Sequence, residues 1–310
     1  MTEKHIAALT ATERASAQSA PALVTGLYVP GDRPDRFDKA VATGADLAIL
    51  DLEDAVAPDQ KAAAREAVVR WLSARGPLQN GPVIQVRINA IHGSDFGADR
   101  GADRGADFRA DLSALAPLQA GFELRVPKVE TVDDLDAVVA LAPGRPIAAL
   151  IETARGVENA LLIAQHEAVV RLALGESDLA SDLGTAAREA MDYARVRVLF
   201  AARAAGLPAP MLSAFTDIRN LEALRADTER GRALGWVGRT AVHPTQLTVI
   251  AEVFRPDSAA VAWATDVVNS LQFGGVSTLA NGEMVDPAML GRARSILGLA
   301  ARPDASAPVN

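Results

Sequence analysis

The chain has 310 residues, 49% of them hydrophobic, with a net charge of −8 and no cysteine. This length suits one large domain or two ordinary ones with a sizeable core. The acidic balance argues against a nucleic-acid or anionic-membrane partner, and the lack of cysteine excludes disulfides, thiolate zinc sites and a cysteine nucleophile. No apolar run approaches membrane-spanning length, and residues 1–20 lack a signal-peptide core, so we expect a cytoplasmic protein.

The first elements alternate between strand and helix. Residues 1–20 have no clear apolar stripe and are predicted to form a flexible tail. Pro34 in the first turn and Gly44 beyond the last residue indicate a helix over 34–43. Strands are predicted at 23–29, 47–51 and 83–88, and a second helix at 58–75.

A low-complexity repeat, GADRGADRGAD, follows at residues 97–107. Glycine recurs at every fourth position with balanced charges, which indicates a flexible loop. Spaced aspartates also occur in EF-hand calcium loops, but the 12-residue pattern and its terminal glutamate are absent. We therefore expect a solvated loop.

The alternation then resumes and completes eight strand–helix pairs over residues 21–255. Such continuous aliphatic strands indicate a parallel sheet covered by helices, and eight repeats favour a closed (β/α)₈ TIM barrel over an open sheet. Residues 256–310 are predicted to form a C-terminal helical extension that either packs on the barrel or, as we expect, contacts a neighbouring subunit. Helices are expected at 108–118, 132–141, 157–166, 185–205, 218–234, 256–270 and 287–299, strands at 123–128, 147–151, 170–174, 211–215 and 236–242, and a loop at 274–282.

In such a barrel the chemistry lies at the carboxyl ends of the strands. Polar residues at these ends, in strand order, are Asp32 and Arg33, then Asp51, Glu53 and Asp54, then Arg87, Lys128, Glu152, Glu176 and Asp178, and finally His243.

Glu152 and Asp178 follow the fifth and sixth strands and should be neighbours around one rim. Two carboxylates plus water suit Mg²⁺, with Mn²⁺ as a substitute. The alternative is that they cap helices, since Glu176-Ser177-Asp178 precedes a helix-like run. The barrel rule favours metal or substrate binding. The lack of a histidine pair at metal spacing argues against a histidine-rich zinc site.

Three further strand-end residues allow two interpretations each. Arg87 either pairs with an internal carboxylate or binds a substrate carboxylate or enolate, and its position favours the second. Lys128 has the position of a Schiff-base lysine, but Arg125 and Glu130 flank it, which favours a structural or substrate-charge role. His243 is either a proton carrier or a helix-entry hydrogen-bonding residue.

Several sequence blocks stand out along the chain, namely LYVPGDRPDRFDKAVATGADLAILDLEDAVAP, VRIN, PKVET, LIETARGVENA, GESDLASDLG, AVHPTQL and GEMVDPAMLGRAR. Together and in this order they resemble the citrate lyase β-subunit-like branch of the HpcH/HpaI aldolase family. The resemblance implies a (β/α)₈ barrel, Mg²⁺ dependence, cleavage or formation of a carbon–carbon bond in acyl-CoA or acyl-carrier thioesters, and a homotrimer or hexamer. The repeat at 97–107 departs from the family's usual spacing.

By this resemblance, Glu152 and Asp178 match the metal-binding carboxylates and Arg87 the substrate-binding arginine. Asp286 matches an acidic residue that related lyases supply from an adjacent subunit, and it is our candidate general base. The hypothesis is that Mg²⁺ polarises a 3-hydroxyacyl thioester while Arg87 stabilises the enolate. Lys128, Glu53 and Asp54 are expected to bind substrate, and Arg33 and Arg36 either meet the phosphates of coenzyme A or are surface charges.

Three rival functions remain at this stage. The first rival is a metal-dependent aldolase that acts on free pyruvate-derived hydroxy-keto acids, and the second is an aldolase that forms a Schiff base on Lys128. The third, from a different class, is a non-catalytic or obligate subunit of a larger lyase complex.

Overall fold

The structure, a computed structural model, describes residues 22–75, 81–91, 105–272 and 274–302. The predicted tail at 1–20 and most of the repeat at 97–107 lie outside these residues. The end of the repeat differs from the predicted loop, because Ala106 and Asp107 begin helix α4 (Ala106–Leu115). Gly105 precedes this helix with a φ of 108°, a conformation that glycine adopts most readily.

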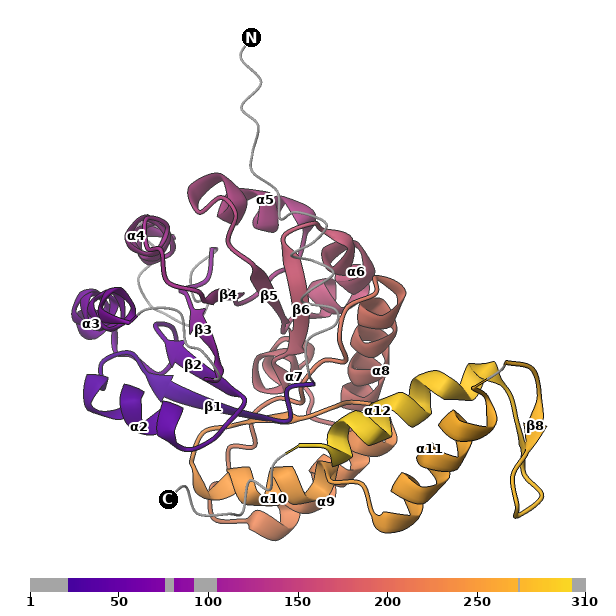
Figure 1. Cartoon of the computed structure of the whole chain (residues 1–310). Helices are drawn as coiled ribbons and strands as arrows, with labels where there is room; N and C mark the ends of the chain where they lie inside the picture. The colour runs from indigo at the N-terminus through magenta and orange to yellow at the C-terminus, as the bar shows by residue number, and fades with distance from the viewer. Residues whose placement is uncertain (1–21, 76–80, 92–104, 273, 303–310) are drawn as a thin grey trace.

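A curled sheet of seven parallel strands forms the centre of the molecule (Figure 1). Its order is β6-β5-β4-β3-β2-β1-β7. Every residue of β2 and β5 is buried, as expected for strands covered on both faces. The bounds are β1 Thr25–Pro30, β2 Leu47–Asp51, β3 Val83–Arg87, β4 Glu123–Val126, β5 Ile147–Ile151, β6 Val169–Leu174 and β7 Arg239–Ala241.

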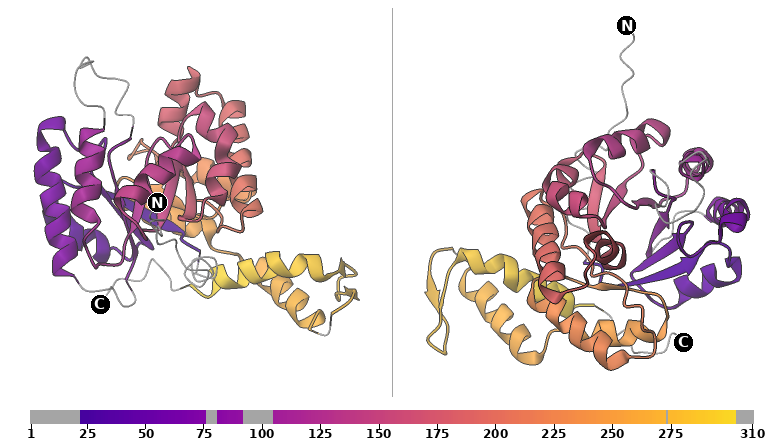
Figure 2. Two further views of the ribbon diagram at one scale, coloured as in Figure 1. Left: turned by 90° about the horizontal axis from the view of Figure 1, so that it is seen from above. Right: turned by 180° about the vertical axis from the view of Figure 1, so that it is seen from behind.

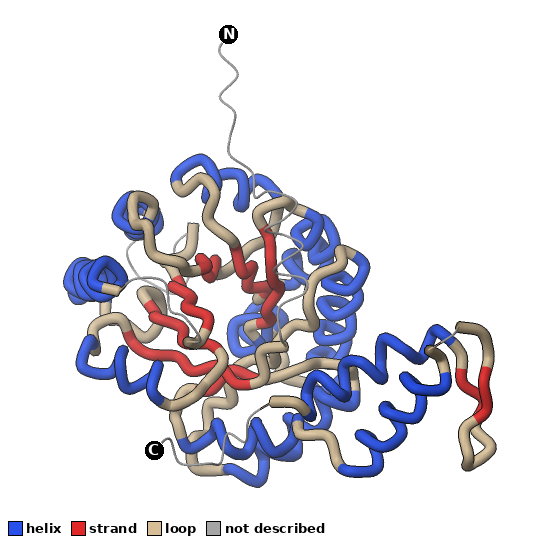
Figure 3. Tube along the Cα trace, viewed as in Figure 1, coloured by secondary structure: helices blue, strands red, loops and turns tan. Residues whose placement is uncertain are grey.

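Helices surround the sheet on its outer side (Figures 2 and 3). Their apolar faces pack with the outward-facing strand residues in one large core. None of the described helices is long and apolar enough to cross a membrane. The bounds are η1 Pro34–Arg36, α2 Phe37–Ala42, η2 Pro58–Gln60, α3 Lys61–Ala74, α5 Val132–Leu141, α6 Ala154–Gln165, α7 Glu176–Leu183, α8 Arg188–Ala204, α9 Leu221–Ala233 and α10 Thr245–Phe254.

The sheet does not close into the predicted eight-stranded barrel. In place of a strand at 211–215, the described chain makes only two isolated parallel bridges, Ala173 to Met211 and Leu212 to Arg239. Prolines at 208 and 210 have no N–H to donate to a ladder just before this segment. The strand expected at 236–242 shrinks to β7, because Gly238 has a φ of 81° and its backbone lies against Leu23 and Val24.

The C-terminal extension projects away from the sheet (Figures 1 and 2). Helices α11 (Ser258–Ser270) and α12 (Leu290–Ala300) pack together around a small core that includes Val267, Val285 and Ala293. Between them, β8 (Ser277–Thr278) and β9 (Met284–Val285) form an antiparallel pair, and η3 spans Pro287–Met289. The predicted loop at 274–282 therefore contains a short strand.

Candidate active site

A cavity of about 380 Å³ lies at the carboxyl ends of the strands. Because parallel strands deliver their carboxyl ends to one rim, residues distant in sequence meet there. The predicted site residues Asp54, Arg87, Glu152 and Asp178 line this cavity, together with Tyr28, Asp51, Arg125 and Ser213.

Arg87, at the end of β3, is held by acidic residues that follow β2. Its Nε and Nη2 atoms donate to the two carboxylate oxygens of Asp51 at 2.7 and 2.6 Å, a bidentate pair that follows from their direct pairing in the sheet. Its Nη1 lies 3.0 Å from Glu53 Oε2 and 3.2 Å from Asp54 Oδ2. Burial lowers the pKa of Arg87, but the Asp51 carboxylate more than offsets this, so the pKa lies above its ordinary value. The internal pairing that the sequence left open is therefore present, in a side chain that also lines the cavity.

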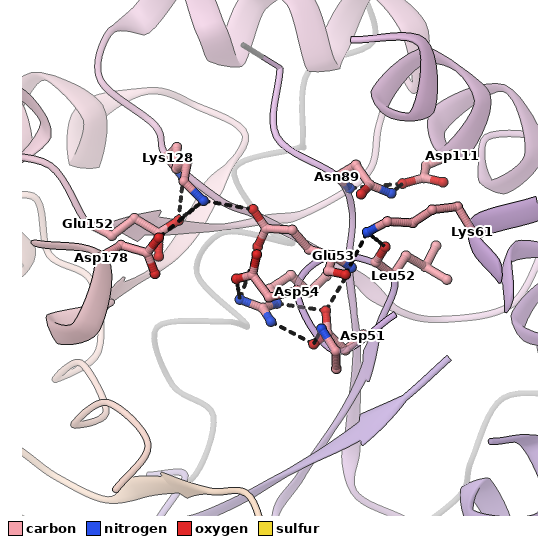
Figure 4. A network of polar contacts seen from close by, with 12 residues as sticks. Asp51, Leu52, Glu53, Asp54, Lys61, Asn89, Asp111, Lys128, Glu152 and Asp178 are labelled. Atoms are coloured by element: carbon pink, nitrogen blue, oxygen red, sulfur yellow. Dashed lines mark hydrogen bonds and ion pairs between the residues drawn. The ribbon is translucent and has the colours of Figure 1, made fainter. Parts of the chain in front are cut away.

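Lys128, just beyond β4, lies among three carboxylates (Figure 4). Its Nζ is 3.1 Å from Glu53 Oε1, 3.3 Å from Asp178 Oδ1 and 3.9 Å from Glu152 Oε1. Burial lowers the pKa of Lys128, but these carboxylates raise it above its ordinary value overall. Because a Schiff base requires a neutral amine, this environment argues against the Schiff-base interpretation.

Glu152 is 1% exposed and carries a strongly perturbed carboxyl group. Burial raises its pKa to about 8, and the Glu53 carboxylate adds to the effect. Burial likewise raises the pKa of Glu53 to about 7, against the opposing charge of Arg87. Carboxylates packed this closely repel one another, so a cation between them is stabilised.

The donor set is compatible with Mg²⁺. Glu152 Oε1 and Asp178 Oδ1 both face the Lys128 ammonium. A divalent cation bound beside this ammonium would therefore have a carboxylate oxygen from each of the two residues. The described residues contain no group of three or more acidic or histidine side chains arranged as a metal cluster. Mg²⁺ tolerates this, because it takes one or two protein carboxylates and fills its octahedral shell with water and substrate oxygens.

The backbone around Glu152 and Asp178 helps to position their carboxylates. Asp178 stands in the first turn of α7, where a carboxylate suits the helix dipole, but the N-cap residue itself is Gly175. The Lys128 N–H donates to Glu152 Oε1 at 2.9 Å, from a residue whose φ of 52° is unusual for a non-glycine. An atom at the Cβ position of Gly175 would lie 2.3 Å from Glu152 Oε2, so only glycine fits there.

Some cavity residues escaped the sequence analysis. The Tyr28 ring lies under two guanidinium groups, 5.2 Å from Arg87 Cζ and 5.5 Å from Arg125 Cζ. Ser213 donates to Glu176, which Arg195 of α8 also holds through an Nε to Oε1 contact of 2.6 Å. The signal that could have identified Tyr28 and Arg125 is that each is a polar residue flanked by apolar residues in its strand, β1 and β4 respectively.

The remaining predicted residues lie away from this cavity. Arg33 is exposed and pairs with Asp35, whereas Arg36 lines a second cavity of about 440 Å³ with Lys39 and His243. His243 Nδ1 lies 2.8 Å from Thr245 Oγ1 at the start of α10, which confirms a helix-entry hydrogen bond.

Asp286 lies on the projecting extension. Its carboxylate accepts a hydrogen bond from the Ala288 N–H at 2.9 Å at the start of η3. It does not line the cavity of its own chain.

Comparison with known proteins relates the chain to one family. The family described as HpcH/HpaI aldolase/citrate lyase matches residues 24–244. A (3S)-malyl-CoA thioesterase of Cereibacter sphaeroides is 36% identical over 77% of this chain and 79% of its own length. A citrate lyase subunit beta-like protein of Deinococcus radiodurans is 34% identical over 89% of this chain and 97% of its own. The crystal structure of CitE from Mycobacterium tuberculosis with magnesium, acetoacetate and coenzyme A covers 92% of this chain and all of that chain, at 32% identity and a TM-score of 0.73.

Proposed function

The chain belongs to the HpcH/HpaI aldolase/citrate lyase family, and on that premise we propose that it is a Mg²⁺-dependent carbon–carbon lyase. Its substrate is a 3-hydroxyacyl-CoA-type thioester, such as citryl-, malyl- or citramalyl-CoA. One observation carries the proposal: the carboxylates of Glu53, Glu152 and Asp178 converge on the Lys128 ammonium. Two of these acids, Glu152 and Asp178, line the cavity at the strand ends together with Arg87. Buried acids with raised pKa values that meet in a cavity are typical of functional sites.

Glu152 and Asp178 would hold the metal. Bound there, Mg²⁺ would act as a Lewis acid toward the carboxylate and hydroxyl or keto oxygens of the substrate. Lys128 keeps Glu53 and Asp178 in place through its ammonium group and Glu152 through its backbone N–H. The magnesium in the CitE structure supports Mg²⁺ as the metal.

The bond that breaks joins the hydroxyl-bearing carbon to the carbon next to the thioester carbonyl. A base removes the hydroxyl proton, a carbonyl forms, and the electron pair of the broken bond passes to the thioester enolate, which is then protonated. Arg87 stabilises this enolate, because its guanidinium is already fixed by Asp51 and needs no reorganisation during the reaction.

Coenzyme A would extend from the cavity toward the end of β1. Arg33 and Arg36 are our candidates for its phosphates, and Arg36 lines the second cavity with Lys39. The malyl-CoA thioesterase and the coenzyme A-containing CitE structure support a thioester of coenzyme A as the substrate class.

We also propose that the general base, Asp286, comes from another subunit of a homotrimer or hexamer. Asp286 does not reach the cavity of its own chain, and the extension that carries it projects outward (Figure 1). Tyr193, Val196 and Phe200, all exposed, share one face of α8 and offer apolar area for assembly. Light scattering that gave the mass of a single chain would contradict this assembly.

Hydrolysis of the thioester is the second candidate function. The relative named (3S)-malyl-CoA thioesterase, at 36% identity, favours it specifically. The other rivals remain an aldolase acting on free hydroxy-keto acids and a subunit that lacks turnover by itself.

Metal removal tests the proposal against Schiff-base chemistry. We expect EDTA to abolish thioester turnover and added Mg²⁺ to restore it. Borohydride with substrate should leave the mass of the protein unchanged, because the carboxylates around Lys128 keep its amine protonated. Activity that resists EDTA, or an adduct on Lys128, would overturn the metal mechanism.

A further inference from the structure

Arg125 has no role in the mechanism above, yet it lines the same cavity. We propose that it forms an anion subsite that binds a second carboxylate of the substrate, separate from the one held at Glu152 and Asp178. This inference rests on the proposed function and narrows its substrate class.

Arg125 is a buried guanidinium without an acidic partner. Three arginines are buried in the described part of the chain, namely Arg125, Arg195 and Arg239. Arg195 pairs with Glu176 and Asp227, and Arg239 pairs with Asp227. Arg125, 3% exposed, contacts no carboxylate among the described residues. A buried charge without a counter-ion is costly, so its presence indicates that a ligand supplies one.

The contacts of Arg125 hold it in place without neutralising it. Its Nη1 donates to Gln85 Oε1 at 3.1 Å, and its Cζ lies 5.5 Å from the centre of the Tyr28 ring. Its Nε is buried with no hydrogen-bond partner. An aromatic face and an amide oxygen orient the planar fork, which leaves donors for a ligand.

The nearby acids are already committed to other cations. Arg125 pairs in register with Arg87 on β3, so both side chains lie on the inner face of the sheet. Asp51 and Asp54 bind Arg87, and Glu123 accepts from Arg171 at 3.1 Å and from Gln85 at 2.7 Å. Arg125 therefore lines the cavity as a guanidinium that no described carboxylate contacts.

A planar guanidinium binds a carboxylate through two parallel hydrogen bonds. We infer that the preferred substrate releases a 2-oxo acid that carries a second carboxylate. A thioester whose 2-oxo acid fragment ends in hydrogen or methyl would leave Arg125 unpaired and bind less tightly.

Two 2-oxo acids test this inference directly. Oxaloacetate, freshly dissolved, and 2-oxobutyrate differ by a carboxylate in place of a methyl group. With saturating Mg²⁺, calorimetry should show that the protein binds oxaloacetate about tenfold to a hundredfold more tightly. Arg125→Met should bind 2-oxobutyrate normally and lose the preference, whereas Arg125→Lys should keep part of it.

Arg155→Met, at an exposed arginine of α6, is the matched control and should change neither affinity. One outcome would show that the anion subsite is wrong while the proposed function stands. In that outcome the wild-type protein binds 2-oxobutyrate and shows no tighter binding of oxaloacetate, or Arg125→Met keeps the preference for oxaloacetate. Binding of neither acid with Mg²⁺ would contradict both. Should Arg125→Met fail to fold, the wild-type comparison and Arg125→Lys still decide the question.

Discussion

Glu152→Gln should abolish Mg²⁺ binding and lower turnover by roughly a thousandfold, since Lewis-acid catalysis is worth several kcal/mol. Glutamine keeps the shape of the side chain but removes the charge that a hard divalent cation requires. Titration calorimetry and thioester turnover measure the two effects. Glu222→Gln, at an exposed glutamate in the first turn of α9, is the control and should behave as wild type.

The same variant has a signature in stability that is independent of activity. Burial raises the pKa of Glu152 from 4.5 to about 8, so the metal-free folded protein binds an extra proton that the unfolded chain releases near pH 4.5. The stability contributed by this protonated group is complete below about pH 4.5 and is lost as the pH rises toward 8. Glutamine cannot ionise. In EDTA, the Tm of Glu152→Gln should therefore fall less between pH 5 and 8 than that of the wild type, and parallel curves would contradict the assignment.

Arg87→Met carries the second-largest expected effect. It leaves Asp51 and Glu53 as buried carboxylates without their guanidinium, at a cost of about 3 kcal/mol in the free energy of unfolding. Turnover should fall about a thousandfold through loss of enolate stabilisation. Urea unfolding and steady-state kinetics measure the two effects.

Arg87→Lys separates charge from geometry, because lysine keeps the charge but cannot form the bidentate pair with Asp51. We expect it to recover most of the stability and little of the turnover. Arg75→Met, at a more exposed arginine after α3, should change stability by less than about 1 kcal/mol. Full activity of Arg87→Lys would show that a point charge suffices and that fixed geometry is unimportant.

The elements predicted with correct bounds have strong local signals. The strands Leu47–Asp51 and Ile147–Ile151 are continuous buried runs, aliphatic except for Asp51 at the end of the first. Helix Val132–Leu141 begins with a capping box between Thr131 and Asp134, which fixes its first residue. Where a local motif specifies an end, the sequence predicts it correctly.

The errors occur where tertiary structure decides. The sequence places one helix at 185–205 after a helix-like run beyond Asp178, but a separate helix, α7, forms over 176–183 and ends at Gly184, whose φ is 66°. The missing strand at 211–215 needed partners on both sides, and only single bridges form. The loss of this strand does not follow from the residues of the segment alone.

The sequence predicts several of the residues that line the cavity, but not which ion pairs they form with one another. The strand-end rule brings Arg87, Glu152 and Asp178 to one cavity. That Asp51 binds Arg87 depends on the register of β2 against β3, and a slip of one residue would turn the side chains to opposite faces. The position of Lys128 among carboxylates from three different strand ends also depends on the curl of the sheet.

The products of one reaction test the central claim most directly. The purified chain, with Mg²⁺ and a panel of citryl-, malyl- and citramalyl-CoA, should release a 2-oxo acid while the coenzyme A remains esterified as the shortened acyl thioester. Detection of the 2-oxo acid together with free thiol, both over time, distinguishes cleavage of the carbon–carbon bond from hydrolysis. Release of 2-oxo acid without free thiol is the predicted result. Free thiol without 2-oxo acid, or turnover of free hydroxy-keto acids alone, would contradict the lyase assignment.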